Sequence, residues 1–200
     1  MQEGLSFAVS KPELIGTYIV DIVAMVFAFP VALFPAMSES WGGASAAGIL
    51  FSAMAVGSLL MTLLSGWTSQ VKHHGRAVIL AAIAWAIFIL GLGYATQLWM
   101  AVLFLILAGG ADMIRGLFRG IIWNETVPNE LRGRLSGLEM ISYMSGPLLG
   151  NARAGWVAAH SSVATSITTG GVICTVAVIG TAFLLPKFWK YESQVGKDLF

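Results

Sequence analysis

The sequence predicts an all-α membrane protein with six transmembrane helices. Hydrophobic residues make up 57% of its 200 residues and charged residues only 10%, whereas a soluble domain carries about 25% charged residues. Six apolar stretches, each near the roughly 20 residues that a membrane-spanning helix needs, are separated by short polar segments. The basic residues alternate between these segments as they do in membrane proteins.

The first three apolar segments are expected at residues 14–37, 46–67 and 77–94. The first contains Asp21 and, near its far end, Pro30, which predicts a bend because proline removes a backbone donor. The second is rich in Ala, Gly and Ser, which permit close contact between helices. The third is almost wholly apolar.

The last three segments are expected at residues 99–121, 135–159 and 164–185. The fifth contains Gly146, Pro147 and Gly150, and a proline beside small residues predicts a helix that can bend. Residues 1–13 read as a polar lead-in and residues 187–200 as a polar tail. The predicted membrane domain therefore spans residues 14–186.

Ten of the eleven Lys and Arg residues fall in alternate loops, on one side of the predicted bundle, with Arg153 as the exception. By the positive-inside rule this distribution predicts that both termini are cytoplasmic. A cleavable signal peptide is not expected, because the first apolar segment is too long and acidic residues precede it. The predicted location is a bacterial inner membrane.

Several classes of function are disfavoured by the sequence. The net charge of +1 argues against a nucleic-acid partner, and the single cysteine, Cys174, cannot form an intrachain disulfide. No phosphate-binding glycine motif or nucleophile motif is present. Adjacent His73 and His74 lie in a loop without a nearby ligand cluster, so neither a metal site nor a cofactor is expected. No histidine lies within a predicted segment, which disfavours an intramembrane serine protease.

Candidate functional residues are the few charges inside or beside the apolar segments. Asp21 lies roughly 12 Å into the first segment, where an ionised carboxylate is costly without a partner or a watery cavity. It is either a proton carrier or part of a structural salt bridge. Asp112, Arg115 and Arg119 share one helix face by their spacing, as a gate at a cavity mouth or as an ion pair with snorkelling arginines.

The fifth segment carries one predicted stripe with steps of three and four residues. The stripe is either a mobile, charged edge that faces a cavity or a packing seam with a charge at each end. Its members are Glu139, Tyr143, Gly146, Gly150 and Arg153.

Three stretches of the sequence, residues 16–37, 110–119 and 127–158, resemble the major facilitator superfamily. The resemblance covers essentially the whole chain and is nearest to the branch of bacterial efflux proteins that includes the enterobactin exporter. It implies that the chain is the C-terminal six-helix half of such a transporter. It also implies that the first and fourth segments line a central cavity, which makes Asp21, Asp112 and Glu139 candidates for cavity or proton-coupling residues.

The loop from Gly66 to Arg76 resembles the cytoplasmic gating motif of that superfamily, although Gln70 stands where an acid is expected. The resemblance gives candidate gating and cytoplasmic-loop residues, which are Gly66, Gly75, Arg76, Arg119, Arg132 and Arg134. Candidate sites of helix bending are Pro30, Gly146, Pro147 and Gly150.

The function that the resemblance implies is proton-coupled export of a small molecule, such as a siderophore or a drug, and not an enzymatic reaction. Its expected partners are the substrate, protons, the lipid bilayer, and either an N-terminal transporter half or a second copy of this chain. A truncated or non-transporting six-helix membrane interaction protein is the alternative. Neither the substrate nor the coupling ion can be read from the residues.

Overall fold

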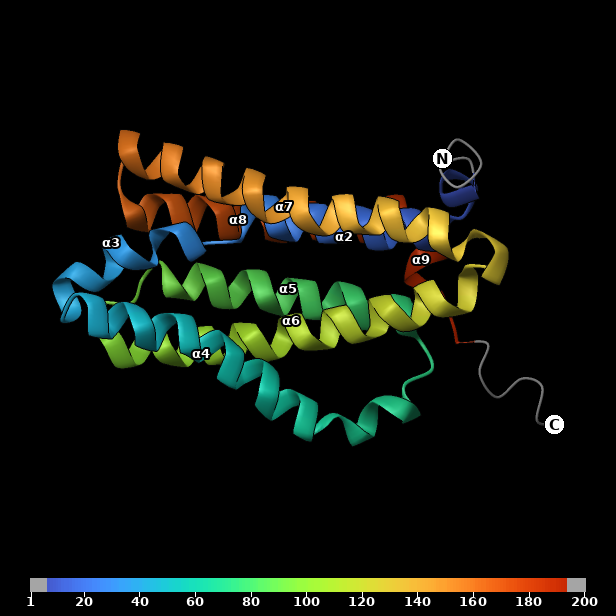
Figure 1. Cartoon of the computed structure of the whole chain (residues 1–200), viewed down its shortest axis with the longest axis horizontal. Helices are drawn as coiled ribbons and strands as arrows, with labels where there is room; N and C mark the ends of the chain where they lie inside the picture. The colour runs from blue at the N-terminus through green and yellow to red at the C-terminus, as the bar shows by residue number, and fades with distance from the viewer. Residues whose placement is uncertain (1–6, 194–200) are drawn as a thin grey trace.

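The structure is a computed structural model that describes residues 7–193, and within that part every regular element is helical. Six long helices run side by side along the molecule (Figure 1). This arrangement confirms the all-α class that the sequence predicts. The six helices are α2 (Pro12–Phe27), α4 (Ala44–Leu63), α5 (His74–Leu92), α6 (Leu98–Thr126), α7 (Arg132–His160) and α8 (Val163–Leu184).

Short helical elements connect the long ones or follow the last of them. They are η1 (Val31–Leu33), α3 (Phe34–Ser38), η2 (Glu39–Trp41), η3 (Ser65–Gln70), η4 (Asn129–Leu131) and α9 (Pro186–Trp189). Residues 1–6 of the predicted lead-in and 194–200 of the predicted tail lie outside the described residues.

The first predicted segment, residues 14–37, is wrong as a single bent helix. Helix α2 ends at Phe27, and a new helical stretch begins only at Val31. Pro30 explains the interruption, because proline lacks a backbone N–H and pushes the residue before it out of the helical conformation. Across the gap, the N–H of Ala32 donates to Oδ1 of Asn151 on α7, at 3.1 Å. The predicted bend at Pro30 is therefore a complete break.

Two other predicted boundaries also shift. The second segment is expected to continue to residue 67, but α4 ends at Leu63 and the chain then tightens into η3. The hydroxyls of Ser65 and Thr68 donate to carbonyls three residues earlier, which favours this tighter turn. The fourth segment extends further than expected, to Thr126.

Among residues 7–193, five helical spans are long and apolar enough to cross a membrane. They comprise residues 12–41 as one interrupted span, together with α4, α5, α6 and α8. Helix α7 has the necessary length but is the least apolar of the six long helices. A helix of this polarity is stable in a membrane when its polar side faces other helices or a watery cavity.

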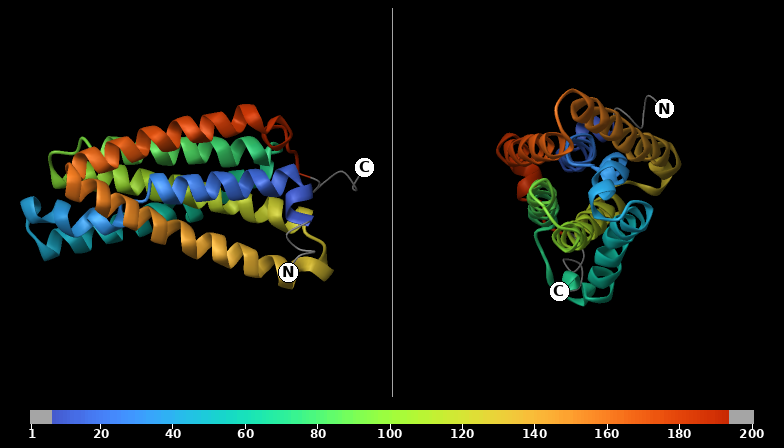
Figure 2. Two further views of the ribbon diagram at one scale, coloured as in Figure 1. Left: turned by 90° about the horizontal axis from the view of Figure 1, so that it is seen from above. Right: turned by 90° about the vertical axis from the view of Figure 1, so that its left-hand side faces the viewer.

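In the bundle, the first long helix of each half of the chain packs against helices of the other half. In chain order the first triple is α2, α4 and α5, and the second is α6, α7 and α8. Helix α2 packs mainly against α7 and α8 of the second triple, whereas α6 packs against α4 and α5 of the first (Figure 2). Contacts between α5 and α8 join the two groups. The first helices of the triples, α2 and α6, meet inside the bundle.

Glycines bring the backbones of α4 and α6 into contact. A Cβ on Gly109 would collide with the backbone of Met54, and a Cβ on Gly57 would collide with the backbone carbonyl of Ile106. The hydroxyl of Ser58 donates to the carbonyl of Gly109 at 2.9 Å. This close approach confirms the expectation that the small residues of the second segment permit tight helix packing.

Replacing Gly109 by Leu is expected to force α4 and α6 apart and to destabilise the fold by roughly 1–3 kcal/mol or more, the usual effect of overpacking. A Cβ added to Gly116 on the same helix would meet no atom within 4 Å, so Gly116→Leu is the matched control. Thermal unfolding in detergent micelles, followed by circular dichroism, compares the two variants. Equal melting temperatures would refute the backbone contact.

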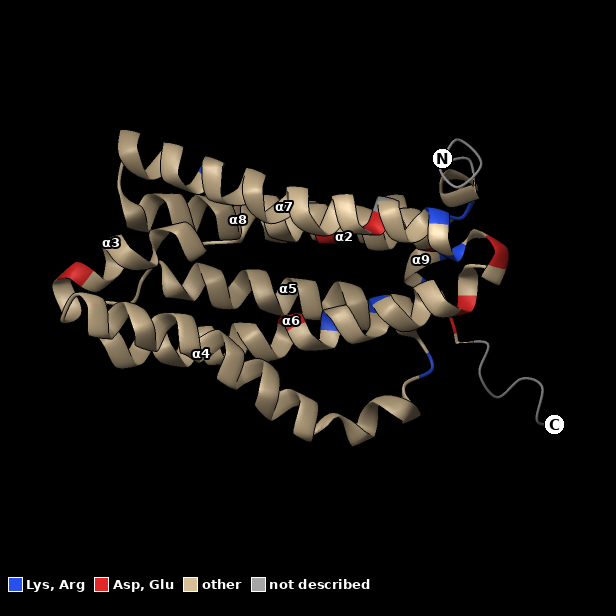
Figure 3. Cartoon of the chain, in the orientation of Figure 1, with Lys and Arg blue, Asp and Glu red and all other residues tan. Residues whose placement is uncertain are grey.

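The basic residues gather at one end of the bundle (Figure 3), the end where the first described turn and α9 also lie. Arg153 instead lies in the C-terminal half of α7. It donates from Nη2 to the carbonyl of Ser166 on α8 at 3.2 Å. The clustering agrees with the predicted alternation of charged and uncharged loops.

Candidate functional site

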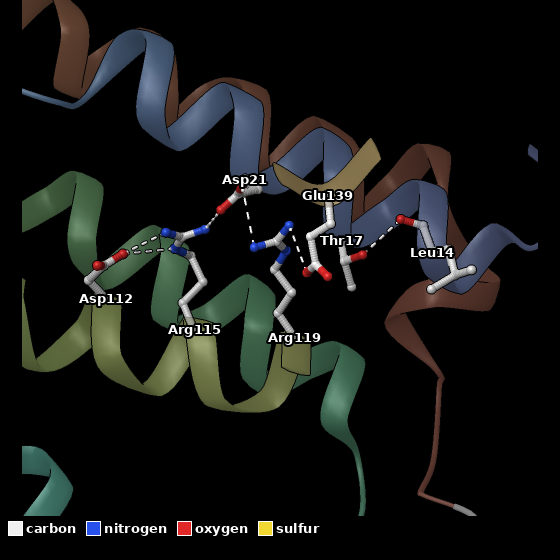
Figure 4. Close-up of polar contacts among 7 residues, drawn as sticks. All are labelled: Leu14, Thr17, Asp21, Asp112, Arg115, Arg119 and Glu139. Atoms are coloured by element: carbon white, nitrogen blue, oxygen red, sulfur yellow. Dashed lines mark hydrogen bonds and ion pairs between the residues drawn. The ribbon is translucent and has the colours of Figure 1, made fainter. Parts of the chain in front are cut away.

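Asp21 lies on α2 in the interior of the bundle and is only 2% exposed. Its Oδ1 accepts a hydrogen bond from Nη1 of Arg115, which comes from α6 (Figure 4). One turn earlier on α2, the hydroxyl of Thr17 donates to the carbonyl of Leu14 at 2.8 Å. A buried ion pair therefore joins α2 to α6, the first helices of the two triples.

Arg115 also binds a second carboxylate. It donates from Nε and Nη2 to Oδ1 of Asp112, at 3.1 and 2.6 Å. Asp112 precedes Arg115 by three residues, the spacing that places two side chains on one face of a helix. The contact confirms that Asp112 and Arg115 share one face of α6 and form an ion pair along it, although Arg115 is buried in the bundle and does not snorkel to its surface.

Arg119, one turn further along α6, continues the set of contacts. Its Nη1 lies 3.7 Å from Oδ2 of Asp21, and its Nη2 lies 3.3 Å from Oε1 of Glu139 on α7. The guanidinium carbon lies 5.8 Å from the centre of the Tyr18 ring, within the range of a cation–π contact. Arg119 thus connects α6 to both α2 and α7.

The five charged residues form a continuous series, which we call the charge ladder: Asp112, Arg115, Asp21, Arg119 and Glu139. Signs alternate along it. Three carboxylates face two guanidinium groups, so the fully ionised ladder carries one net negative charge. One bound proton would neutralise it.

The two halves of the charge ladder differ in how well they are bonded. On the Asp112 side, Arg115 forms hydrogen bonds to both carboxylates. On the Glu139 side, Oδ2 of Asp21 and both Nε and Nη2 of Arg119 are buried without a hydrogen-bond partner among the described residues. Buried charged groups that lack hydrogen bonds are costly. A rearrangement that gave these atoms hydrogen-bond partners would therefore stabilise the Glu139 side of the ladder most.

Exposure also changes along the charge ladder. The side chains of Asp21 and Arg115 are 3% and 6% exposed, whereas those of Glu139 and Asp112 are 28% and 35% exposed. The two carboxylates at the ends are therefore reachable, and the central pair is enclosed. A proton or a polar ligand meets the ends of the ladder first.

Helix α7 is held against α2 by two of the predicted bending residues. A Cβ on Gly150 would collide with the carbonyl of Met25, and a Cβ on Gly146 would lie 2.8 Å from the Met25 Cβ. Pro147 lies inside α7, which continues through it to His160. A bend of α7 at Gly146 and Pro147 stays a prediction.

The residues of the predicted stripe on α7 have two kinds of surroundings. Gly146 and Gly150 face α2, Glu139 reaches Arg119, and Arg153 reaches α8. Tyr143, however, is 66% exposed, whereas Ser142 beside it is buried. The packed face passes from Glu139 through Ser142 to Gly146, in steps of three and four residues. Tyr143 therefore belongs to the exposed edge of α7 and not to its packing seam.

The candidate gating residues lie apart from the ladder, except for Arg119. Gly66 is exposed in η3. Gly75 donates from its N–H to the carbonyl of Tyr191 at 3.4 Å, and Arg76 lies 5.7 Å from the centre of the Trp189 ring. The contacts of this loop therefore run to α9 and the residues after it.

The two loop arginines at the start of α7 have different surroundings. Arg132 donates from Nη2 to the carbonyl of Asn124 at 3.2 Å, which ties the first turn of α7 to the end of α6. Arg134 is exposed on the first turn of α7. Both lie in the first turn of α7, and α7 begins at the end of the bundle where the basic residues gather (Figure 3).

Sequence reasoning missed a second polar cluster near that end, around Glu125. Its carboxylate accepts hydrogen bonds from the Tyr191 hydroxyl at 2.9 Å and from the Ser193 hydroxyl at 2.6 Å. Burial raises the pKa of Tyr191 to about 12, and the bonded carboxylate acts in the same direction. The cluster fastens the residues after α9 to α6. Contacts over such sequence separations have no signature in one sequence.

Within residues 7–193, no group of three or more His, Cys, Asp or Glu side chains is arranged to hold a metal ion. His73 instead pairs through Nδ1 with Oε1 of Glu192 at 3.3 Å. His74 bonds through Nε2 to the carbonyl of Val71 at 3.0 Å. Both histidines have local structural contacts.

A sequence model described as Major Facilitator Superfamily matches residues 18–197. The enterobactin exporter EntS of Salmonella typhi is 27% identical over 166 residues, which make up 82% of this chain and 39% of that protein. EntS of Escherichia coli O127:H6 is 23% identical over 184 residues, or 91% of this chain and 44% of that protein. The chain thus spans less than half the length of these relatives. No solved structure matches it.

The family match covers most of the chain, and the fold agrees with it. In this superfamily each six-helix half contains two three-helix repeats, and the described helices divide into two triples that exchange their first members. The resemblance that the sequence carries at residues 16–37, 110–119 and 127–158 is confirmed. The chain belongs to the Major Facilitator Superfamily, whose members are multi-pass membrane transporters rather than enzymes.

Proposed function

We propose that the chain is the C-terminal half of a proton-coupled exporter of a small molecule, of the siderophore or drug efflux type. Support comes from the relatives, which are named as exporters and match the chain over less than half of their length. Transporters of this superfamily bind substrate between two six-helix halves. The chain therefore requires an N-terminal half or a second copy of itself as partner.

The observation that carries this proposal is the charge ladder. An apolar bundle that holds five linked charges, of which Asp21, Arg115 and Arg119 are buried, does so at considerable cost, and intramembrane charges commonly mark ion and substrate pathways. The ladder ties α2 and α6, the first helices of the two triples, to α7. Movement of these helices relative to one another must therefore break or remake its ion pairs.

Protons act in this proposal at the loosely bonded side of the charge ladder. A proton on Glu139 removes the attraction of that carboxylate for Arg119, which is then free to bind Asp21 more closely. The change neutralises the excess negative charge and releases α7 from α6. Asp21 and Asp112 are the further candidates for the proton, and Gly146, Pro147 and Gly150 supply the bend by which α7 moves.

The membrane domain in this proposal is residues 14–186, with both termini cytoplasmic in a bacterial inner membrane. The clustering of basic residues at the end that contains α9 supports this orientation. Gly66, Gly75 and Arg76, with Arg132 and Arg134, then lie on the cytoplasmic side. There they would restrain the bundle through α9 and through the end of α6.

The face proposed to meet the other half includes α2 and α7. A nearly apolar cavity of about 230 Å³ lies between the first described turn and these two helices. Ile19 and Ile22 line it and are 38% and 41% exposed. Tyr18, which also contacts Arg119, forms part of its wall. The cavity would thus place one side of the substrate near the charge ladder.

Export by a chimera tests the proposal. Residues 14–193 replace the matching part of EntS from Escherichia coli O127:H6, and enterobactin in the medium is measured in cells without their own exporter. The chimera is expected to export at a rate well above the empty vector. Export by the 200-residue chain alone would identify a second copy of the chain, rather than an N-terminal half, as its partner. A chimera that is present in the membrane at the level of intact EntS, yet exports nothing, would favour a non-transporting membrane interaction protein.

A further inference from the structure

A second cleft, of about 430 Å³, lies at the end of the bundle where the basic residues gather and is unrelated to the charge ladder. Its walls come from η3, α5 and α6. Helix α4 diverges from α6 near its C-terminal end (Figure 1). Three basic residues, Lys72, His73 and Arg76, line one part of the cleft. Leu80, Ala81 and Ala84 line another.

The order of these residues on α5 makes the cleft amphipathic. Arg76, Leu80 and Ala84 follow one another at intervals of four residues, so they share a helix face. Lys72 and His73 precede α5 and Arg76 lies in its first turn. The apolar wall continues for about 12 Å beyond Arg76 at 1.5 Å per residue. Ile114 of α6 closes the apolar part on its other side.

The positive charges in the cleft are available to a ligand. Neither Lys72 nor Arg76 forms an ion pair with a carboxylate among residues 7–193. Nε of Arg76 is buried and has no hydrogen-bond partner in the same part of the chain, although its guanidinium packs over the Trp189 ring. The carboxylate that faces this region, Glu192, pairs with His73.

We propose that this cleft binds an anionic phospholipid of the surrounding bilayer. The phosphate binds between Lys72 and Arg76, and one acyl chain lies against Leu80, Ala84 and Ile114. Trp67, which is 44% exposed in η3, lies at the headgroup level where tryptophan is enriched. Basic pockets between membrane helices are suited to anionic headgroups. The apolar wall favours a lipid over free phosphate, which would use only the basic end.

Native mass spectrometry of the full chain in detergent tests this inference, with phosphatidylglycerol and phosphatidylcholine added in equal amounts. The chain is expected to retain phosphatidylglycerol in preference. Lys72→Gln with Arg76→Gln is expected to weaken that binding about thirtyfold, which corresponds to about 1 kcal/mol for each basic residue. The matched control is Lys187→Gln with Lys190→Gln, which removes two charges at the same end of the bundle, outside the cleft.

A second variant tests whether the acyl chain contributes to binding in addition to the phosphate headgroup. Ala84→Phe fills the apolar part of the cleft and keeps both cations, so it is expected to weaken phosphatidylglycerol binding at least fivefold. Soluble glycerol phosphate is the probe for a site that needs only the phosphate. Circular dichroism confirms that each variant is folded before it is compared.

Three results would overturn the inference. Phosphatidylcholine that binds as strongly as phosphatidylglycerol would remove the role of charge. A control variant that loses as much binding as the cleft variant would show a general electrostatic effect. Glycerol phosphate that binds as tightly as the lipid, with no effect of Ala84→Phe, would assign the cleft to a soluble phosphate compound.

Discussion

Replacing Asp21 by Asn is expected to destabilise the folded chain by about 3–5 kcal/mol, the usual cost of removing one partner of a buried ion pair. Arg115 and Arg119 would remain in the interior, opposite a neutral amide, and both are less than a tenth exposed. Titration of the purified protein with a denaturing detergent, followed by circular dichroism, measures the change in free energy of unfolding.

Two comparisons make the result specific to the buried pair. Asp112→Asn removes a carboxylate that is one-third exposed, so it is expected to cost at most about 1 kcal/mol, as for a solvated ion pair. Asp21→Asn combined with Arg115→Gln is expected to cost less than the sum of the two single substitutions, because both remove the same buried ion pair. Equal losses for Asp21→Asn and Asp112→Asn would contradict the described burial.

Replacing Glu139 by Gln is expected to abolish the proton dependence of export by the chimera, with a loss of more than tenfold in the rate that a pH gradient drives. Glutamine keeps the size of the side chain but does not exchange a proton at physiological pH, so Arg119 permanently loses the charge of its partner on α7. The rate is measured in proteoliposomes with and without a pH gradient.

The control for this substitution is Glu130→Gln. Glu130 lies in η4, is exposed, and is outside the charge ladder. It is expected to leave the proton-driven rate unchanged. Since Glu139 is partly exposed, Glu139→Gln is also expected to change stability far less than Asp21→Asn does. A Glu139→Gln variant that still responds fully to the pH gradient would remove this residue from the coupling.

The long helices could be located from the sequence because the signal that defines them is strong and local. A run of about 20 apolar residues can be recognised without knowing which other helices it packs against. Five of the six long helices lie in spans of this kind. The break after Phe27 was not predicted as a break. A proline near the end of an apolar run is compatible with a bend or an interruption, and the choice depends on the contact of Ala32 with Asn151.

The candidate site was predictable only where its contacts lie within one helix. The spacing of Asp112, Arg115 and Arg119 indicates a shared face, and the structure shows Arg115 bound to Asp112. Asp21 and Arg115 are separated by 94 residues, and nothing in one sequence states which helices are neighbours. The exposure of Tyr143 also depends on contacts between distant residues. The position of α2, and not only the period of the helix, decides which residues of α7 are packed.

The contacts of the loop before α5 also depend on distant residues. A resemblance of local sequence identifies Arg76 as a gating candidate, but its described partner is Trp189 on α9. The cleft beside Arg76 brings η3 and α5 together with Ile114 of α6, which is distant in the sequence. Both features arise from packing at the end of the bundle.

In the proposed mechanism, this chain works as one half of a two-half, proton-coupled exporter. The most direct test is to reconstitute the purified chimera and the purified 200-residue chain in separate proteoliposomes, and to record internal pH and enterobactin movement together under an imposed pH gradient. The chimera is expected to move enterobactin against a counterflow of protons, and the chain alone is expected to do so only where two copies pair. Enterobactin movement through the chimera without any movement of protons would contradict proton-coupled export.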